Sequence, residues 1–185
     1  MLRYLALLRG INVGGNTVAM ADLRDLAAGL GLAAATTYIR SGNLLFSHAE
    51  ADTGELADRL EREIAGRLGI RSAVVVLGRA ELAQVIADNP FPAEQNPKYL
   101  HAVFRRDEIG PDLIGLVAAA VQRAGDAGSR DDAAIVGRTL FLHTPDGFGR
   151  SDLAARLTSA RAQPTGTARN WATVTTLLTM LDAAG

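Results

Sequence analysis

A glycine-rich loop near the N-terminus holds the first residues whose types and spacing could do chemistry. It contains Arg9, Asn12, Gly14, Gly15 and Asn16. Glycine lets backbone amides point at an anion, and arginine adds positive charge and a forked hydrogen-bond donor. The spacing fits neither the Walker phosphate loop nor the dinucleotide fingerprint G-x-G-x-x-G. A turn that needs positive φ would use the same residues, so anion binding and plain turn formation stay open as alternatives.

A second polar loop is expected at Arg40-Ser41-Gly42-Asn43, between two short apolar runs. Chain order allows this loop to meet the first one, and its side chains could then bind the same ligand. Ser41 does not lie in the G-x-S-x-G context of a nucleophile elbow, so it is assigned no nucleophilic role. The same residue types suit an ordinary turn between two strands, which is the alternative interpretation.

A third candidate segment, Arg169-Asn170-Trp171, precedes an apolar helical pattern near the C-terminus. An arginine beside the free amides of a helix start can bind an acidic group. Asn170 is equally a good N-cap, and the ring of Trp171, the only tryptophan, is typical of a residue that anchors a helix on a core. Ligand binding and helix docking therefore both stay open for this segment.

No metal, cofactor or catalytic group can be assigned from the sequence. The chain has no cysteine, and its three histidines, His48, His101 and His143, show no metal-ligand spacing. Asp131-Asp132 has the composition of a solvated turn rather than of a catalytic carboxylate pair. The catalytic residues stay unknown, no cofactor is expected, and the sequence does not decide whether the protein is an enzyme.

The composition describes a folded chain whose charges are almost balanced. Its 185 residues include 19 Lys and Arg against 20 Asp and Glu, and 48% of them are hydrophobic. This content excludes disorder, and the net charge of −1 leaves sequence-independent nucleic-acid binding without its electrostatic driving force. The lack of cysteine, of a signal-peptide pattern and of a long apolar stretch predicts a cytoplasmic protein that does not contact membranes.

Hydrophobic periodicity predicts the elements that must position these loops. The first half reads strand, helix, strand, strand, helix, strand, which is the order of the ferredoxin-like split unit. Asp52 and Glu55 form an approximate capping box before the second helix, and Gly31 and Gly69 are placed to end the two helices. The expected ranges are 2–8, 23–30, 36–39, 44–46, 56–68 and 72–77, with a further helix over 81–87.

The second half repeats this order, although its final strand, near 164–168, is weakly patterned. The interpretation is an α+β protein made of two ferredoxin-like units, a duplication, followed by a C-terminal helix that Asn170 begins. Three prolines between Asn89 and Pro97 favour a linker there. The expected domains are a first unit over 1–88, a Pro-rich linker over 89–98 and a second unit over 99–185.

Several segments together resemble a known family over nearly the whole chain. They are LLRGINVGG at 7–15, YIRSGN at 38–43, NPF at 89–91, PDG at 145–147, GRS at 149–151 and TARNW at 167–171. With these segments the sequence is similar to the bacterial domain-of-unknown-function family 1697. The resemblance implies a compact α+β fold of duplicated ferredoxin-like units and no particular activity. Members commonly have Gln, Lys, Asn and Lys where this chain has Arg40, Asp152, Ala172 and Thr176.

The leading hypothesis is binding of a small anionic ligand, a phosphorylated metabolite or a nucleotide, in a polar cleft between loops. In it, Arg9 supplies charge, Gly14 and Gly15 supply backbone amides, and Asn12 and Asn43 orient the ligand. The remaining members of the candidate set are Arg40, Ser41, Arg169 and Asn170. The alternative is a protein–protein interaction or oligomeric module in which these motifs only hold the fold, and a homo-oligomer stays open. Single-stranded RNA is disfavoured because only 5% of the residues are aromatic and no RNP motif occurs.

Overall fold

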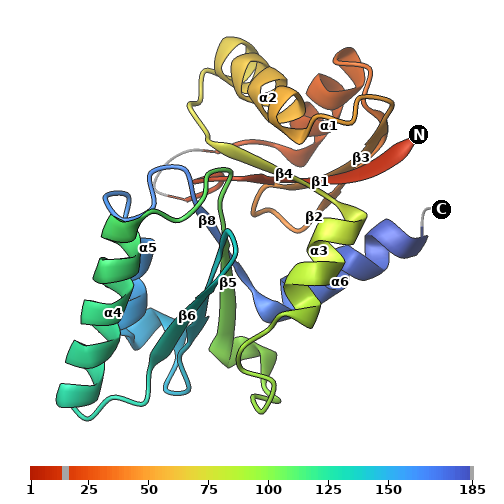
Figure 1. Ribbon diagram of the computed structural model, residues 1–185. Coiled ribbons are helices and arrows are strands. Elements are labelled where there is room, and N and C mark those ends of the chain that lie inside the picture. The colour runs from red at the N-terminus through yellow and green to blue at the C-terminus, as the bar shows by residue number, and fades with distance from the viewer. Residues whose placement is uncertain (14–16, 184–185) are drawn as a thin grey trace. The chain divides into compact units, whose positions relative to one another are not determined.

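A computed structural model describes residues 1–13 and 17–183, and these residues form two units with one four-stranded sheet each (Figure 1). Unit 1 comprises Met1–Ala83 together with Leu177–Gly185, and unit 2 comprises Gln84–Thr176. The two units have the same order of elements and the same strand order. The predicted α+β fold in two similar units is therefore confirmed. The predicted domain bounds, 1–88 and 99–185 with a Pro-rich linker over 89–98, stay a prediction.

Unit 1 contains the strand, helix, strand, strand, helix, strand order that the sequence predicts. Its strands are antiparallel neighbours in the order β2-β3-β1-β4. Its six elements are β1 (Leu2–Leu8), α1 (Met20–Gly29), β2 (Ala33–Tyr38), β3 (Asn43–His48), α2 (Thr53–Leu68) and β4 (Val74–Gly78). Helix α3 (Arg79–Ala87) follows β4 directly.

Short-range signals fix both ends of α2. The side chain of Asp52 accepts the backbone N–H of Gly54 at 2.8 Å and that of Glu55 at 3.1 Å, so it is the N-cap. At the other end Gly69 adopts a left-handed conformation with φ of 67°, which glycine reaches without a Cβ penalty. The capping residues that the sequence indicates are thus confirmed, although the helix begins at Thr53, three residues before the expected range of 56–68.

The core of unit 1 lies between one face of its sheet and the helices α1 and α2. The helices contribute Leu26, Leu56 and Leu60, which are at most 1% exposed. Alternate residues of β1 face them, among them Leu8. Leu7, on the opposite face of β1, is also completely buried. Because both faces of β1 are buried, its sequence reads as a continuous apolar run rather than as an alternating one.

Unit 2 repeats this arrangement with strand order β6-β7-β5-β8. Its elements are β5 (Leu100–Phe104), α4 (Pro111–Asp126), β6 (Asp132–Val136), β7 (Thr139–His143), α5 (Asp152–Thr158) and β8 (Thr167–Asn170), with 3-10 turns η1 (Pro97–Tyr99) and η2 (Phe148–Arg150). The weakly patterned last strand of this unit is present as β8, which pairs antiparallel with β5 from Phe104↔Thr167 to His101↔Asn170. Its pattern is weak because polar side chains, Thr167 and Arg169, take the buried positions.

The last helix, α6 (Trp171–Ala183), begins in unit 2 and ends in unit 1. Its residues Leu177 and Leu181 are buried and are counted with unit 1. In the same unit the guanidinium Nε of Arg79 lies 2.7 Å from a carboxylate oxygen of Asp182. Of the helices that the structure describes, none has the length and apolar character needed to cross a membrane.

Candidate functional site

The glycine-rich loop after β1 and the turn between β2 and β3 meet, and the side chain of Asn12 joins them. Its amide nitrogen donates to the carbonyl oxygen of Arg40 at 2.6 Å and to that of Val18 at 3.2 Å. Its amide oxygen accepts the backbone N–H of Val18 at 2.9 Å. One asparagine therefore closes its own loop and fastens it to the turn 28 residues further along the chain.

The two joined loops border a hollow of about 500 Å³ in unit 1, called here the loop hollow. Its volume is within the range of small-molecule sites. Val13 and Ile39 on its border are 61% and 51% exposed, so the hollow offers apolar as well as polar surface. The described residues that line it are Ile11, Asn12, Val13, Thr17, Ile39, Arg40 and Ser41.

Ile39 is held in an unfavourable backbone conformation at the border of the loop hollow. Its φ is 48°, in the left-handed region that β-branched residues avoid. Such a conformation costs on the order of 1–3 kcal/mol and persists only where the surrounding structure imposes it. Strained residues cluster at ligand-binding sites, so the conformation of Ile39 favours this hollow as a binding site.

Replacing Ile39 by asparagine is expected to raise the free energy of unfolding by about 1 kcal/mol, because asparagine tolerates the left-handed region. The measurement is urea unfolding followed by circular dichroism. Ile114→Asn is the matched control, since Ile114 is also 51% exposed but lies in helix α4. Equal loss of stability in both variants would show that Ile39 is not strained.

Two other predicted residues of unit 1, Arg9 and Asn43, do not line the loop hollow. The backbone of Arg9 is fixed on both sides, its N–H donating to Ala73 O at 2.9 Å and its carbonyl accepting the hydroxyl of Ser72 at 2.8 Å. Burial lowers the pKa of the Arg9 guanidinium. Asn43 is fully buried on β3.

The side chain of Asn43 braces the turn from inside. Its amide nitrogen donates to the carbonyl oxygen of Tyr38 and to the hydroxyl of Ser41, both at 3.1 Å.

Of the residues predicted in unit 1, the structure brings Asn12, Arg40 and Ser41 together around one hollow. The predicted residues Gly14 and Gly15, like Asn16, lie outside the residues that the structure describes.

Gly42 sets the geometry of the turn that carries Arg40. Its φ is 74°, and its carbonyl accepts the N–H of Leu8 at 2.8 Å. A Cβ added at this position would lie 2.9 Å from Leu8 Cβ and 3.2 Å from Ile11 Cβ. Only glycine fits both the backbone conformation and the space between the two loops.

Arg169 and Asn170 belong to unit 2, where their contacts are with neighbouring backbone and side chains. Arg169 Nη1 donates to Thr167 Oγ1 at 2.6 Å and to the carbonyl of Ala168 at 2.9 Å. Burial of this side chain lowers the pKa of Arg169 to about 10. Asn170 Oδ1 accepts the N–H of Ala172 at 3.0 Å, so Asn170 is the N-cap that the sequence predicts.

The remaining contacts of this segment favour helix docking. Asn170 Nδ2 donates to the carbonyl of Pro97 at 2.9 Å, which ties the start of α6 to η1. The ring of Trp171 lies 6.0 Å from that of Phe141, at a tilted angle. These contacts support the structural interpretation for Asn170 and Trp171.

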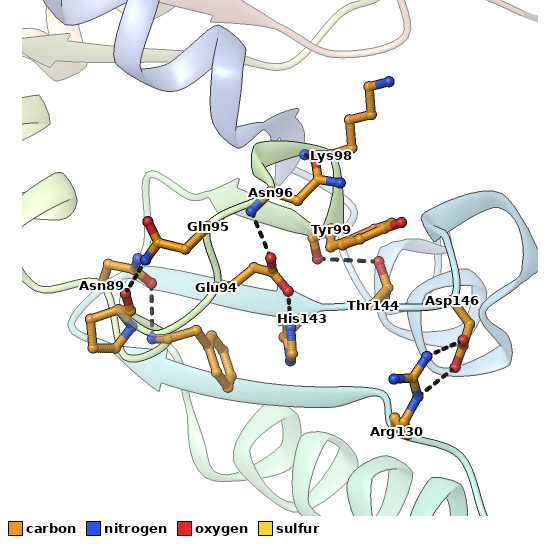
Figure 2. Close-up of polar contacts among 12 residues, drawn as sticks. Asn89, Glu94, Gln95, Asn96, Lys98, Tyr99, Arg130, His143, Thr144 and Asp146 are labelled. Atoms are coloured by element: carbon orange, nitrogen blue, oxygen red, sulfur yellow. Dashed lines mark hydrogen bonds and ion pairs between the residues drawn. The ribbon is translucent and has the colours of Figure 1, made fainter.

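The structure also shows a carboxylate–histidine pair that the sequence does not reveal (Figure 2). His143 Nε2 lies 2.9 Å from Glu94 Oε2, and the ring of Phe91 stacks on the imidazole with centroids 5.2 Å apart. Glu94 Oε1 accepts the N–H of Asn96 at 2.7 Å. The hydrogen bond to His143 is the main cause of a lowered pKa of Glu94. No spacing pattern could have indicated this pair, because its members are 49 residues apart.

This pair orients an imidazole, but its surroundings do not complete a catalytic set. In the described part of the chain, no hydroxyl is hydrogen-bonded to the ring of His143 as a nucleophile would be. Nor do the described residues include a group of three or more His, Cys, Asp and Glu arranged to hold a metal ion. The pair fastens the segment before β5 to the end of β7.

A second histidine, His101 on β5, is partly buried and lacks its full complement of hydrogen bonds. Its ring stacks on Phe148 with centroids 3.9 Å apart. Its Nδ1 is buried and has no hydrogen-bond partner among the described residues. Burial lowers the pKa of His101 to about 4, so the ring is neutral at physiological pH.

Comparisons with known proteins agree with this architecture. A family model described as "Protein of unknown function (DUF1697)" matches residues 1–141. A solved structure, that of the conserved bacterial protein SP0830 from Streptococcus pneumoniae, is similar with a TM-score of 0.68 and 23% sequence identity, covering 97% of this chain and 98% of that one. At this identity the likeness concerns the fold alone. No curated protein matches the chain.

Proposed function

The chain belongs to the DUF1697 family, whose description states no activity, and on that premise we propose that the protein binds a small anionic ligand in the loop hollow of unit 1. The observation that carries this proposal is the bond from Asn12 Nδ2 to the carbonyl of Arg40. It holds two polar loops, distant in sequence, around one hollow of about 500 Å³. A phosphorylated metabolite or a nucleotide fits this size.

The lining of the loop hollow suits a ligand with both a charged and an apolar part. Arg40 is exposed, and its guanidinium makes no hydrogen bond to the described residues, so both prongs of its fork can bind a phosphoryl group. Thr17 and Ser41 provide hydroxyl groups beside it. The role predicted for the backbone amides of Gly14 and Gly15 concerns residues outside those that the structure describes. Val13 and Ile39, which are exposed, offer apolar contact to a base or another uncharged part of the ligand.

In this proposal Arg9 and Asn43 act on the loops rather than on the ligand. Asn43 holds the turn through Tyr38 and Ser41, and the backbone of Arg9 is held by Ser72 and Ala73. Such positioning keeps the hollow formed before a ligand arrives, which lowers the entropy cost of binding.

The test is thermal unfolding of the full chain against nucleotides, sugar phosphates and inorganic phosphate, with Arg40→Gln beside the wild type. A ligand at about 100 times its dissociation constant stabilises a protein by about 2.7 kcal/mol, or roughly 5–10 °C for this chain length. We expect such a shift for one nucleotide or phosphorylated compound, and at least a tenfold weaker affinity in Arg40→Gln.

Arg62→Gln is the matched control, because Arg62 is an exposed arginine of α2 that does not line the hollow. Its affinity should equal that of the wild type. Absence of any shift across the panel, or equal weakening in both variants, would contradict the proposal. The exposed side chains of Val13 and Ile39 would then support the other hypothesis, an interaction surface for a protein partner.

A further inference from the structure

We propose that unit 2 contains a separate anion site, in a groove beside helices α4 and α5 where Arg123, Arg150 and Arg156 lie together, and that its ligand is a small phosphorylated compound without an aromatic part. This groove, called here the arginine groove, has a volume of about 330 Å³. It involves no residue of the loop hollow and does not rest on the function proposed above.

Packing of two helices forms the groove. Helix α4 lies beside α5 (Figure 1), and their apolar faces meet through residues that include Val117 and Leu157. Ala120, Ala124 and Leu153 line the groove. Because alanine side chains are short, α4 leaves room beside α5 instead of filling it.

Three arginines reach the groove from three different elements. Arg123 lies in the last turn of α4, Arg150 ends η2 and Arg156 lies in α5. In the part of the chain that the structure describes, none of these three guanidinium groups is in an ion pair or a side-chain hydrogen bond. Arg130 of the same unit, by contrast, is paired with Asp146 (Figure 2). The three groove arginines thus keep their donors available.

The carboxylates of Asp131 and Asp152 also line the groove, so its formal charge is one positive unit in a chain whose net charge is −1. Arginine forks bind phosphate in fixed bidentate geometry. The carboxylate of Asp152 is exposed and can turn toward water, whereas Asp131 is partly buried. The positive charge and the donor geometry of the arginines therefore both favour an anion. Each aspartate reduces this attraction without reversing it.

The negative end of α4 would repel an anion if its last carbonyl groups were free. They are largely occupied, because Gly128, with φ of 74°, lets the chain turn back on the helix. Three N–H groups close this end, Ala127 to Arg123 O at 3.1 Å, Gly128 to Gly125 O at 2.9 Å and Ser129 to Ala124 O at 2.9 Å. The hydroxyl oxygen of Ser129 accepts the N–H of Asp131 at 3.1 Å, which leaves its proton for a ligand.

The lining also restricts the kind of ligand. No aromatic side chain is among the described residues that line the groove, so a nucleobase would find no stacking partner there. A volume of about 330 Å³ exceeds what an inorganic phosphate alone would fill and is at the small end of ligand sites. A sugar phosphate or a comparable aliphatic phosphate ester satisfies both conditions.

Isothermal titration calorimetry of the full chain tests this site with glucose 6-phosphate and inorganic pyrophosphate at low salt, and with glucose as the uncharged control. We expect both phosphates to bind and glucose not to bind. Arg123→Gln, Arg150→Gln and Arg156→Gln should each weaken binding about tenfold. Arg161→Gln removes an exposed arginine of the same unit outside the groove and should leave the affinity unchanged.

A gain of affinity provides the sharper test, because general damage to the fold cannot produce it. Asp152→Asn should tighten phosphate binding several-fold by removing a negative charge from the groove. Asp107→Asn, an exposed aspartate of unit 2 outside the groove, should not change it. The proposal is overturned if neither phosphate binds at millimolar concentration, or if Arg161→Gln and Asp107→Asn act as strongly as the groove variants. Arg40→Gln should not affect phosphate binding in the arginine groove. The result for this groove is therefore independent of whether the loop hollow binds a ligand.

Discussion

Replacing Gly42 by alanine is expected to lower the free energy of unfolding by about 2–5 kcal/mol. Two effects add: a non-glycine residue at positive φ costs roughly 1–2 kcal/mol, and overpacking a buried site costs roughly 1–3 kcal/mol. The added methyl group would lie 2.9 Å from Leu8 Cβ, and neither atom is the mobile end of a side chain. The loop that carries Ile11 would have to move away from the turn.

The measurement is urea unfolding of Gly42→Ala beside Gly66→Ala. Gly66 lies inside α2, and a Cβ there would have no neighbour within 4 Å. Gly66→Ala should therefore stabilise the protein by about 0.5–1 kcal/mol through helix propensity. A Gly42→Ala variant as stable as the wild type would show that the two loops are not packed as described. Loss of Arg40-dependent ligand binding in Gly42→Ala would in addition connect this packing to the loop hollow.

Acid is expected to destabilise the protein through His101. The ordinary pKa of histidine is 6.5, and burial lowers the pKa of His101 to about 4 in the folded protein. Well above pH 6.5 the ring is neutral in both states and contributes no difference. Between pH 6.5 and about 4 the unfolded chain binds a proton that the folded protein excludes, so stability falls as the pH falls. The full loss is about 3 kcal/mol at most.

His101→Phe should remove this dependence. Phenylalanine keeps the ring stacked on Phe148 and eliminates the buried Nδ1 that lacks a partner. We therefore expect the variant to be at least as stable as the wild type at pH 7 and clearly more stable at pH 5. The free energy of unfolding, measured by urea at each pH, checks this expectation. His48→Gln is the control, and the idea fails if wild type and His101→Phe lose stability equally between pH 6.5 and 5.

Much of the fold can be predicted from the sequence because its signals are local. The capping box at Asp52, the glycine at 69 and the apolar run of β1 each lie within a few residues of the element that they define. β8 is harder to predict because its inward positions hold Thr167 and Arg169 instead of apolar residues. These polar groups are buried by tertiary contacts, which hydrophobic periodicity along the sequence cannot predict.

The candidate sites depend on contacts between residues that are far apart in the sequence. Such contacts cannot be predicted from the sequence alone. Chain order shows that the first two loops could meet, but not that Asn12 would join them through the carbonyl of Arg40. The pair of Glu94 and His143 has no sequence signature at all. The groove arginines, scattered from Arg123 to Arg156, share no spacing and are united only by the packing of α4 on α5.

Unit 1 is built from two separate segments of the chain, because the end of helix α6 belongs to it. The ribosome therefore makes the two segments of this unit at different times. The first 83 residues leave the ribosome long before Leu177, Leu181 and Asp182, which complete the same unit. All of unit 2 emerges in between. The nascent N-terminal segment must therefore wait, with the partner of Arg79 still missing, until the residues of α6 have been synthesised. Vectorial synthesis thus favours unit 2, whose segments are contiguous, as the part that can be completed first.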